Sequence, residues 1–136
     1  MDKVKEMKPM ELKTIQTERA PAAIGPYSQG IGAGPFLFVS GQLGMNPETG
    51  ELVGPDLASQ ARQGLENLKQ ILDAGNCGLK DVVAVDVFLT DMGKFVEFNG
   101  IYAEYFSDHK PARAAIEVSA LPKGACFEIK CIACKA

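Results

Sequence analysis

The sequence predicts an α+β fold in which two α-helices cover one face of a single mixed β-sheet. Three observations lead to this fold class. The chain has 136 residues, a length typical of one domain. Its apolar residues alternate with period two in several short segments and follow a helical period in only two. These segments occur in the order βββαβαββ, and two helices can cover only one face of such a sheet.

The N-terminal half supplies three predicted strands and the first helix. The strands span residues 12–16, 27–31 and 36–43. The third strand, FLFVSGQL, is apolar on both faces, which suggests that both faces are covered. In residues 56–74, apolar side chains recur every three or four positions before Gly75, and this spacing predicts a helix.

The C-terminal half places the second helix among three more strands. Residues 81–90 form a strand, whose predicted core face carries Val83, Val85, Val87 and Leu89. Aromatic residues at helical spacing predict a helix over residues 94–106. Residues 111–135 then form two strands, joined by a turn at the LPKG sequence of residues 121–124.

Charged side chains alternate with apolar ones in these last strands. We expect Arg113 and Glu117 of the first strand, and Glu128 of the second, on the face that the helices leave open. The full set expected there is Ser40, Asp86, Arg113, Glu117 and Glu128, mixed with Phe36, Phe38 and Phe88. Because this face is too apolar for plain contact with water, the pattern predicts that another subunit covers it.

The overall composition is that of an ordinary folded protein. Hydrophobic residues make up 46% of the chain and charged residues 23%, which argues against disorder. The net charge of −3 and the isoelectric point of about 5.2 count against nucleic acid as a partner. No apolar run approaches the 18 or so residues that a membrane helix needs, so we expect no membrane association.

The N-terminal sequence MDKVKEMKPMELK mixes charges with methionines and lacks the apolar stretch of a signal peptide. We therefore expect a cytoplasmic protein, with a flexible extension over residues 1–11 and a single domain over residues 12–136. In that compartment the chain's 4 cysteines are expected to be free thiols.

Two other motifs could suggest chemistry. Cys126, Cys131 and Cys134 have the spacing of plant-type iron–sulfur ligands. Strand alternation, however, places Cys131 on the opposite face from the other two, and no turn residue lies between 125 and 133, so we expect no metal site and a buried Cys131. His109 follows the second predicted helix and is interpreted as a C-terminal cap.

The pair Arg113 and Glu128 allows two interpretations. As exposed strand charges, they would form a surface ion pair that contributes about 0–1 kcal/mol. In a partly dry cleft between subunits, the guanidinium could bind a carboxylate through two hydrogen bonds, and the glutamate could orient or deprotonate a water molecule. Tyr27 and backbone amides would complete such a site.

Three segments carry a resemblance to a known family. They are APAAIGPYSQG at residues 20–30, VSGQLGMNPETGEL at 39–52 and PARAAIEVSALPKGACFEI at 111–129. Through these motifs, and over nearly everything after Lys13, the sequence resembles the Rid (YjgF-type) family of enamine/imine deaminases.

The resemblance implies a specific fold and reaction. The fold would be chorismate-mutase-like, and three copies would form a homotrimer around a central barrel with clefts between neighbours. The substrates would be 2-aminoacrylate, 2-aminocrotonate and their 2-imino acid tautomers, which pyridoxal-phosphate-dependent serine and threonine dehydratases release. Hydrolysis to 2-oxo acids and ammonia would need no cofactor.

The resemblance also implies roles for particular residues. Arg113 would hold the substrate carboxylate, and Glu128 would position the attacking water. Tyr27, Ser40, Gly41 and Asn99 would line the cleft and bind substrate. At position 115 this chain has Ala115 where a common family version has cysteine, and a backbone amide there could still contact the carboxylate.

Two other functions stay open at this point. The family has also been credited with endoribonuclease activity and translation inhibition, against which the acidic charge balance counts. Alternatively, the trimer could bind small carboxylates, or act like a chaperone, without catalysis.

Overall fold

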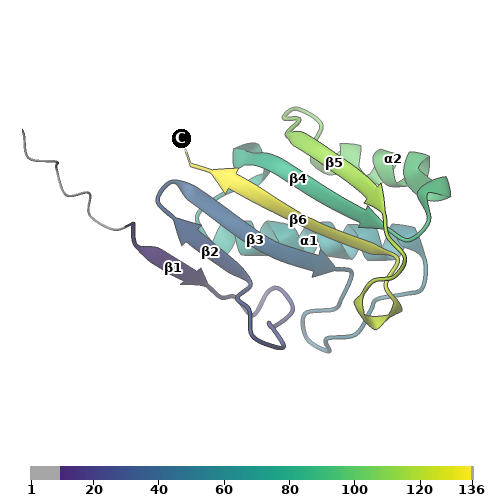
Figure 1. The fold of residues 1–136 in the computed structure, drawn as a ribbon, viewed down its shortest axis with the longest axis horizontal. Coiled ribbons are helices and arrows are strands. Elements are labelled where there is room, and N and C mark those ends of the chain that lie inside the picture. Colours follow the sequence, from purple (N-terminus) through teal and green to yellow (C-terminus); the bar gives the residue numbers. More distant parts are fainter. Residues whose placement is uncertain (1–9, 136) are drawn as a thin grey trace, which may run out of the picture.

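The computed structural model describes residues 10–135 and confirms the α+β class and the predicted order of elements. Two helices lie on one side of a 6-stranded sheet with the strand order β1-β2-β3-β6-β4-β5 (Figure 1). The elements are β1 (Leu12–Ile15), β2 (Gly30–Ala33), β3 (Phe36–Leu43), α1 (Leu57–Ala74), β4 (Val82–Leu89), α2 (Phe95–Tyr105), β5 (Ala112–Glu117) and β6 (Phe127–Cys134).

Local signals account for the bounds of helix α1. The carboxylate of Asp56 accepts a hydrogen bond from the backbone N–H of Ser59 at 3.0 Å and caps the helix start. The predicted apolar stripe is buried, with Leu65, Leu68 and Leu72 fully covered. Gly75 follows the last turn, and its N–H closes the helix end on carbonyls of that turn. This stripe forms the core together with the helix-facing side of the sheet.

Strand β4 carries an irregularity that the alternation did not reveal. Its pairing with β6 shifts register between Val82 and Ala84. Val82 is therefore buried, whereas Val83, which we predicted on the core face, is 44% exposed. The prediction is correct for Val85, Val87 and Leu89, which are buried.

The last two strands are joined by a short 3-10 turn but do not pair with each other. Strand β6 lies between β3 and β4 and is antiparallel to both, whereas β5 lies at the sheet edge, parallel to β4. The parallel pairing follows from the connection, because the crossover between β4 and β5 contains α2.

The register of β5 overturns the predicted face of Arg113 and Glu117. Arg113 pairs with Val85, and Glu117 pairs with Leu89, so both side chains lie on the face that carries the helices. Glu128 pairs with Phe88 on the opposite, open face, as predicted. The edge position explains the error: the apolar side of β5 faces the open side of the sheet, where Ile116 is 50% exposed.

Two further expectations concern the ends of elements. The prediction that His109 caps a helix is wrong, because its Nε2 donates to the carbonyl of Val82 at 2.6 Å and ties the loop before β5 to β4. Residues 1–9 of the expected N-terminal extension lie outside the described residues. Among residues 10–135, no helix is long and apolar enough to cross a membrane.

Candidate functional site

The predicted site residues fall into two groups on opposite faces of the sheet. Tyr27, Ser40, Gly41 and Glu128 line one pocket on the open face, which we call the Glu128 pocket. Asn99 and Arg113 line another on the helix side, which we call the Arg113 pocket. Ala115 follows Arg113 on the same face of β5 and packs against the core.

A β-bulge builds the floor of the Glu128 pocket. The pairing of β3 with β6 shifts between Val39 and Gln42, which leaves Ser40 and Gly41 in a widened segment opposite β6. A Cβ atom on Gly41 would lie only 2.5 Å from Oε2 of Glu128. The carboxylate therefore packs directly on the glycine backbone, which accounts for the glycine in the VSGQ motif.

The protein environment makes Glu128 a stronger base than an exposed glutamate. The side chain is half-buried, and burial raises the pKa of its carboxyl above the ordinary value. The nearby Lys130 ammonium opposes this shift only in part. A carboxylate of raised pKa beside an open pocket is suited to accept a proton from water.

Apolar side chains form the remaining wall of the Glu128 pocket. They are Ala22, Ile24, Leu43, Met45 and Pro122. Lys123 also lines the pocket, and its ammonium donates to the carbonyl of Gly50 at 2.8 Å, which joins the turn before β6 to the loop after β3. Lys123 has φ of 61°, a left-handed conformation that is uncommon for a residue other than glycine.

Two buried amides of α1 support these loops, and neither was predicted from the sequence. The side chain of Gln60 donates to the carbonyl of Gly54 at 2.8 Å and accepts from the N–H of Cys126 at 2.9 Å. Asn67 donates to the carbonyl of Met45 at 2.9 Å. The available signal was the position of both amides on the apolar stripe of the helix, where a polar side chain needs internal partners.

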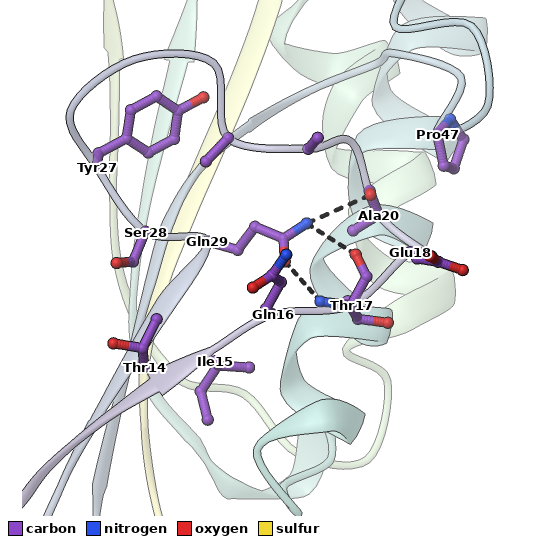
Figure 2. A pocket seen from close by; sticks show the side chains of 12 residues that line it. Thr14, Ile15, Gln16, Thr17, Glu18, Ala20, Tyr27, Ser28, Gln29 and Pro47 are labelled. Carbon is purple, nitrogen blue, oxygen red and sulfur yellow. Dashed lines mark hydrogen bonds between the residues drawn. The ribbon is translucent and has the colours of Figure 1, made fainter.

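The loop of residues 16–29 carries Tyr27 and is organised around another missed residue, Gln29. The Gln29 amide lies beneath the loop and hydrogen-bonds to its backbone (Figure 2). The Oγ of Ser40 donates to the carbonyl of Ser28, and the backbone N–H of Ser40 donates to the carbonyl of Gln29. These bonds fix the base of the loop against the bulge of β3.

Helix α2 presents Asn99 and an aromatic surface to Arg113. An Nη1 proton of Arg113 is donated to Oδ1 of Asn99 at 2.8 Å. The guanidinium carbon lies 4.7 Å from the ring centroid of Tyr102, and the rings of Phe95 and Phe98 lie within 6 Å. These contacts hold the guanidinium through cation–π attraction without neutralising its charge.

The Arg113 guanidinium keeps binding capacity for an anion. Arg113 takes part in no salt bridge within residues 10–135, and Asn99 occupies only one of its five N–H donors. Burial raises the pKa of the underlying Tyr102 hydroxyl to about 12, although Arg113 acts in the opposite direction. Tyr102 therefore remains neutral and offers the arginine no counter-charge, so the free donors suit a carboxylate.

The cysteines are separate from both pockets. Cys131 is buried in the core, as predicted, and burial raises the pKa of its thiol to about 12. All 4 cysteines are free thiols. Within the part of the chain that the structure describes, no three His, Cys, Asp or Glu side chains gather in a way that could hold a metal ion.

Comparison with known proteins places this fold in a family. A family model described as endoribonuclease L-PSP matches residues 17–135. A RutC family protein of Pyrococcus horikoshii is 54% identical over 123 residues, spanning 90% of this chain and 98% of that protein. The 2-iminobutanoate/2-iminopropanoate deaminase of Escherichia coli K12 is 47% identical over 124 residues, covering 89% of this chain and 96% of the deaminase.

A solved structure shows the same fold. A Yersinia pestis protein of the conserved Rid protein family matches with a TM-score of 0.89 and 43% identity, covering 91% of this chain and 99% of that one. The matched region includes both pockets, and it confirms the resemblance that the motifs indicate. This chain therefore belongs to the endoribonuclease L-PSP family, which is the YjgF/Rid family.

Proposed function

We propose that this protein hydrolyses 2-imino acids of the 2-iminopropanoate and 2-iminobutanoate type, together with their enamine tautomers, to 2-oxo acids and ammonia. The observation that carries the proposal is the Arg113 guanidinium, which is held by Asn99 and aromatic rings but has free donors for a carboxylate. The Escherichia coli relative that bears the name of this activity supports the same reaction.

The reaction site is formed between two copies of the chain. Arg113 lies on the helix side of edge strand β5, whereas Glu128 lies on the open face, so one copy cannot turn both groups toward the same small substrate. Exposed apolar side chains on the open face, including Phe36 and Phe38, support coverage by a neighbour. We propose a homotrimer, in which Arg113 of one copy faces Glu128 of the next.

In this site, the chemistry needs one anchor and one base. Arg113 binds the carboxylate, and an enamine substrate first becomes its imine tautomer by gaining a proton at C3 and losing one from nitrogen. Water adds to C2 while Glu128 accepts its proton, and the electrons of the C=N π bond move to nitrogen. Glu128 returns the proton to nitrogen, which gives a tetrahedral carbinolamine. The hydroxyl proton then moves to nitrogen as the C–N bond breaks and the C=O bond forms, so that ammonia and the 2-oxo acid leave.

A coupled assay tests the reaction. A pyridoxal-phosphate-dependent threonine dehydratase generates 2-aminocrotonate, and the rate of 2-oxobutanoate appearance is measured with and without this protein. Acceleration above the spontaneous hydrolysis rate is expected. Equal rates across a wide range of protein concentration would refute the proposed function.

Mixing two inactive variants tests the shared site. In random mixed trimers of Arg113→Ala and Glu128→Gln chains, roughly a quarter of the interfaces combine an intact arginine with an intact glutamate. We expect about that fraction of wild-type activity after co-expression. No recovery from a mixture whose mixed assembly is verified by mass spectrometry would place both groups on one copy and contradict the shared site.

The family description favours ribonuclease activity as a second candidate. Against it, the chain has a net charge of −3, and neither pocket combines a basic stripe with exposed stacking aromatics. RNA cleavage that co-purifies with the protein and is unaffected by Arg113→Ala would favour this alternative.

A further inference from the structure

The loop of residues 16–29 is an unusually long hairpin connection. Its flanking residues Ile15 and Gly30 pair directly as the last and first residues of β1 and β2. No helix or strand forms between them. Loops of this length inside a compact domain need their own source of order and are commonly functional. The loop carries Tyr27, a wall residue of the Glu128 pocket.

One buried side chain supplies this order. The Nε2 group of Gln29 lies 3.0 Å and 3.3 Å from the carbonyl oxygens of Thr17 and Ala20 (Figure 2). It also lies 2.8 Å from the carbonyl oxygen of Pro21. The Oε1 atom accepts the N–H of Thr17 at 2.7 Å. Gln29 is only 3% exposed, so it satisfies loop carbonyls that water reaches poorly.

The backbone of Gln29 connects the same loop to the catalytic base. Its carbonyl accepts the N–H of Ser40 at 2.9 Å. Ser40 precedes Gly41, on whose backbone the Glu128 carboxylate rests. A single residue therefore contacts the first part of the loop through its side chain and the β3 bulge through its main chain.

We infer that Gln29 is a positioning residue for the Glu128 pocket, which acts by holding the loop of residues 16–29 so that Tyr27 keeps its place in the pocket wall. This inference rests on the proposed deaminase function. Gln29 itself does not contact substrate, because its side-chain amide is hydrogen-bonded to backbone groups of the loop.

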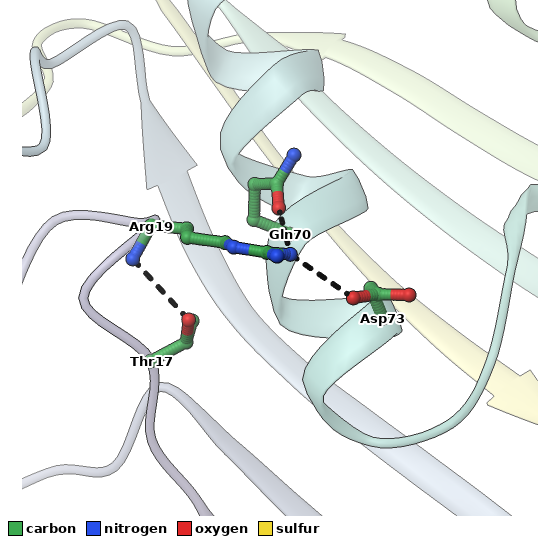
Figure 3. A network of polar contacts seen from close by, with 4 residues as sticks. All are labelled: Thr17, Arg19, Gln70 and Asp73. Carbon is green, nitrogen blue, oxygen red and sulfur yellow. Dashed lines mark hydrogen bonds and ion pairs between the residues drawn. The ribbon is translucent and has the colours of Figure 1, made fainter.

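A second attachment of the loop provides a matched control. The guanidinium of Arg19 bonds to the side chains of Gln70 and Asp73 on α1, at 3.3 Å and 3.2 Å (Figure 3). Both charged partners are largely exposed, so this attachment contributes little. Arg19→Ala is therefore expected to leave kcat/KM within about twofold of wild type.

The decisive variant is Gln29→Glu, which keeps the shape and removes the donor. At pH 8 the introduced carboxylate faces loop carbonyls that it cannot bond, and displacement of the loop should lower kcat/KM on the order of 10- to 100-fold. Acidification protonates the carboxyl and restores one donor. The ratio of variant to wild-type kcat/KM should therefore rise as the pH falls, a recovery that a generally unfolded variant would not show.

A double-mutant cycle with Tyr27→Ala tests whether Gln29 acts through the loop. If it does, Gln29→Ala should reduce kcat/KM far less in the Tyr27→Ala background than in wild type. Circular dichroism and thermal melting verify that each variant is folded. In Gln29→Ala, backbone hydrogen exchange should be faster than in wild type over residues 17–28 and unchanged in α1.

Three outcomes would overturn the inference. They are wild-type kcat/KM in folded Gln29→Glu at pH 8, full additivity with Tyr27→Ala, and a ratio of variant to wild-type activity that does not change with pH. Each of these outcomes is measured against an active wild-type protein. If the proposed function itself is wrong, the wild-type protein shows no acceleration, so the two results can be told apart.

Discussion

Replacement of Arg113 by alanine tests the carboxylate anchor, and the expected loss follows from the guanidinium's surroundings. Asn99 and the aromatic rings hold it without using its full set of donors, which leaves room for a bidentate carboxylate. A hydrogen bond to a charged group contributes about 1.5–3 kcal/mol, so losing two costs about 3–6 kcal/mol. Since 1.36 kcal/mol is a factor of ten, kcat/KM should fall roughly 10²- to 10⁴-fold.

The measurement is the dehydratase-coupled release of 2-oxobutanoate, with the assembly state of each variant followed by light scattering. Arg113→Lys keeps the charge but loses the planar fork, so it should fall between wild type and Arg113→Ala. Arg62→Ala is the matched control, because Arg62 is an exposed arginine paired with Glu104 at 2.7 Å, away from both pockets. Wild-type kcat/KM in a correctly assembled Arg113→Ala protein would refute the reasoning.

Three further predictions concern the Glu128 pocket and the open face. Glu128→Gln should abolish acceleration while preserving 2-oxobutanoate binding by calorimetry, and lost binding would contradict a purely catalytic role. Because the folded-state pKa of Glu128 is raised, wild-type activity should fall as the pH drops through that pKa. The charged carboxylate also destabilises the folded protein at neutral pH, so Glu128→Gln should melt at a higher temperature than wild type there. This difference in melting temperature should vanish under acid conditions, where Glu128 is protonated. Gly41→Ala should displace the Glu128 carboxylate and lower kcat, with little change in melting temperature because the flexible Glu128 side chain can move away from the added methyl group. An unchanged kcat would show that the close packing of Glu128 on Gly41 does not matter for catalysis. Phe38→Lys, at a side chain 45% exposed in the single chain, should shift sedimentation from the proposed trimer to a monomer, whereas a variant that assembles like wild type would exclude this face from the interface.

Local periodicity predicted the elements well because their bounds depend on neighbouring residues. Strand β3 spans Phe36–Leu43, as the sequence predicts, and α1 begins after the capping residue Asp56. The second strand was less well defined: the predicted residues 27–31 include the end of the loop, and β2 spans Gly30–Ala33. Here glycines and a buried glutamine obscure the alternation.

The face of β5 could not be predicted from the same signals. Alternation correctly grouped Arg113 with Ala115 and Glu117, but it does not reveal which group faces the core. The apolar Ile116 was the natural choice for the interior, but in this edge strand its side chain lies on the open face and is half exposed. Pairing across the sheet, which depends on residues far apart in the chain, decides the question.

The resemblance implied a single cleft, whereas the structure divides its residues between two pockets. Tyr27, Ser40, Gly41 and Glu128 line one pocket, and Arg113 and Asn99 line another on the opposite face, a division that only the structure reveals. The supporting amides Gln29, Gln60 and Asn67 were missed, because a single buried amide produces no periodic pattern. Its importance becomes visible only when its hydrogen-bond partners are known.

In the proposed shared site, the placement of Arg113 and Glu128 on opposite sides of one sheet would make turnover depend on protein concentration. An isolated chain can be fully folded and still present Arg113 and Glu128 on opposite faces of the sheet. Dilution below the dissociation constant of the assembly should therefore silence the protein reversibly, well before any change in its circular dichroism. Specific activity would then increase with protein concentration and level off once association is complete.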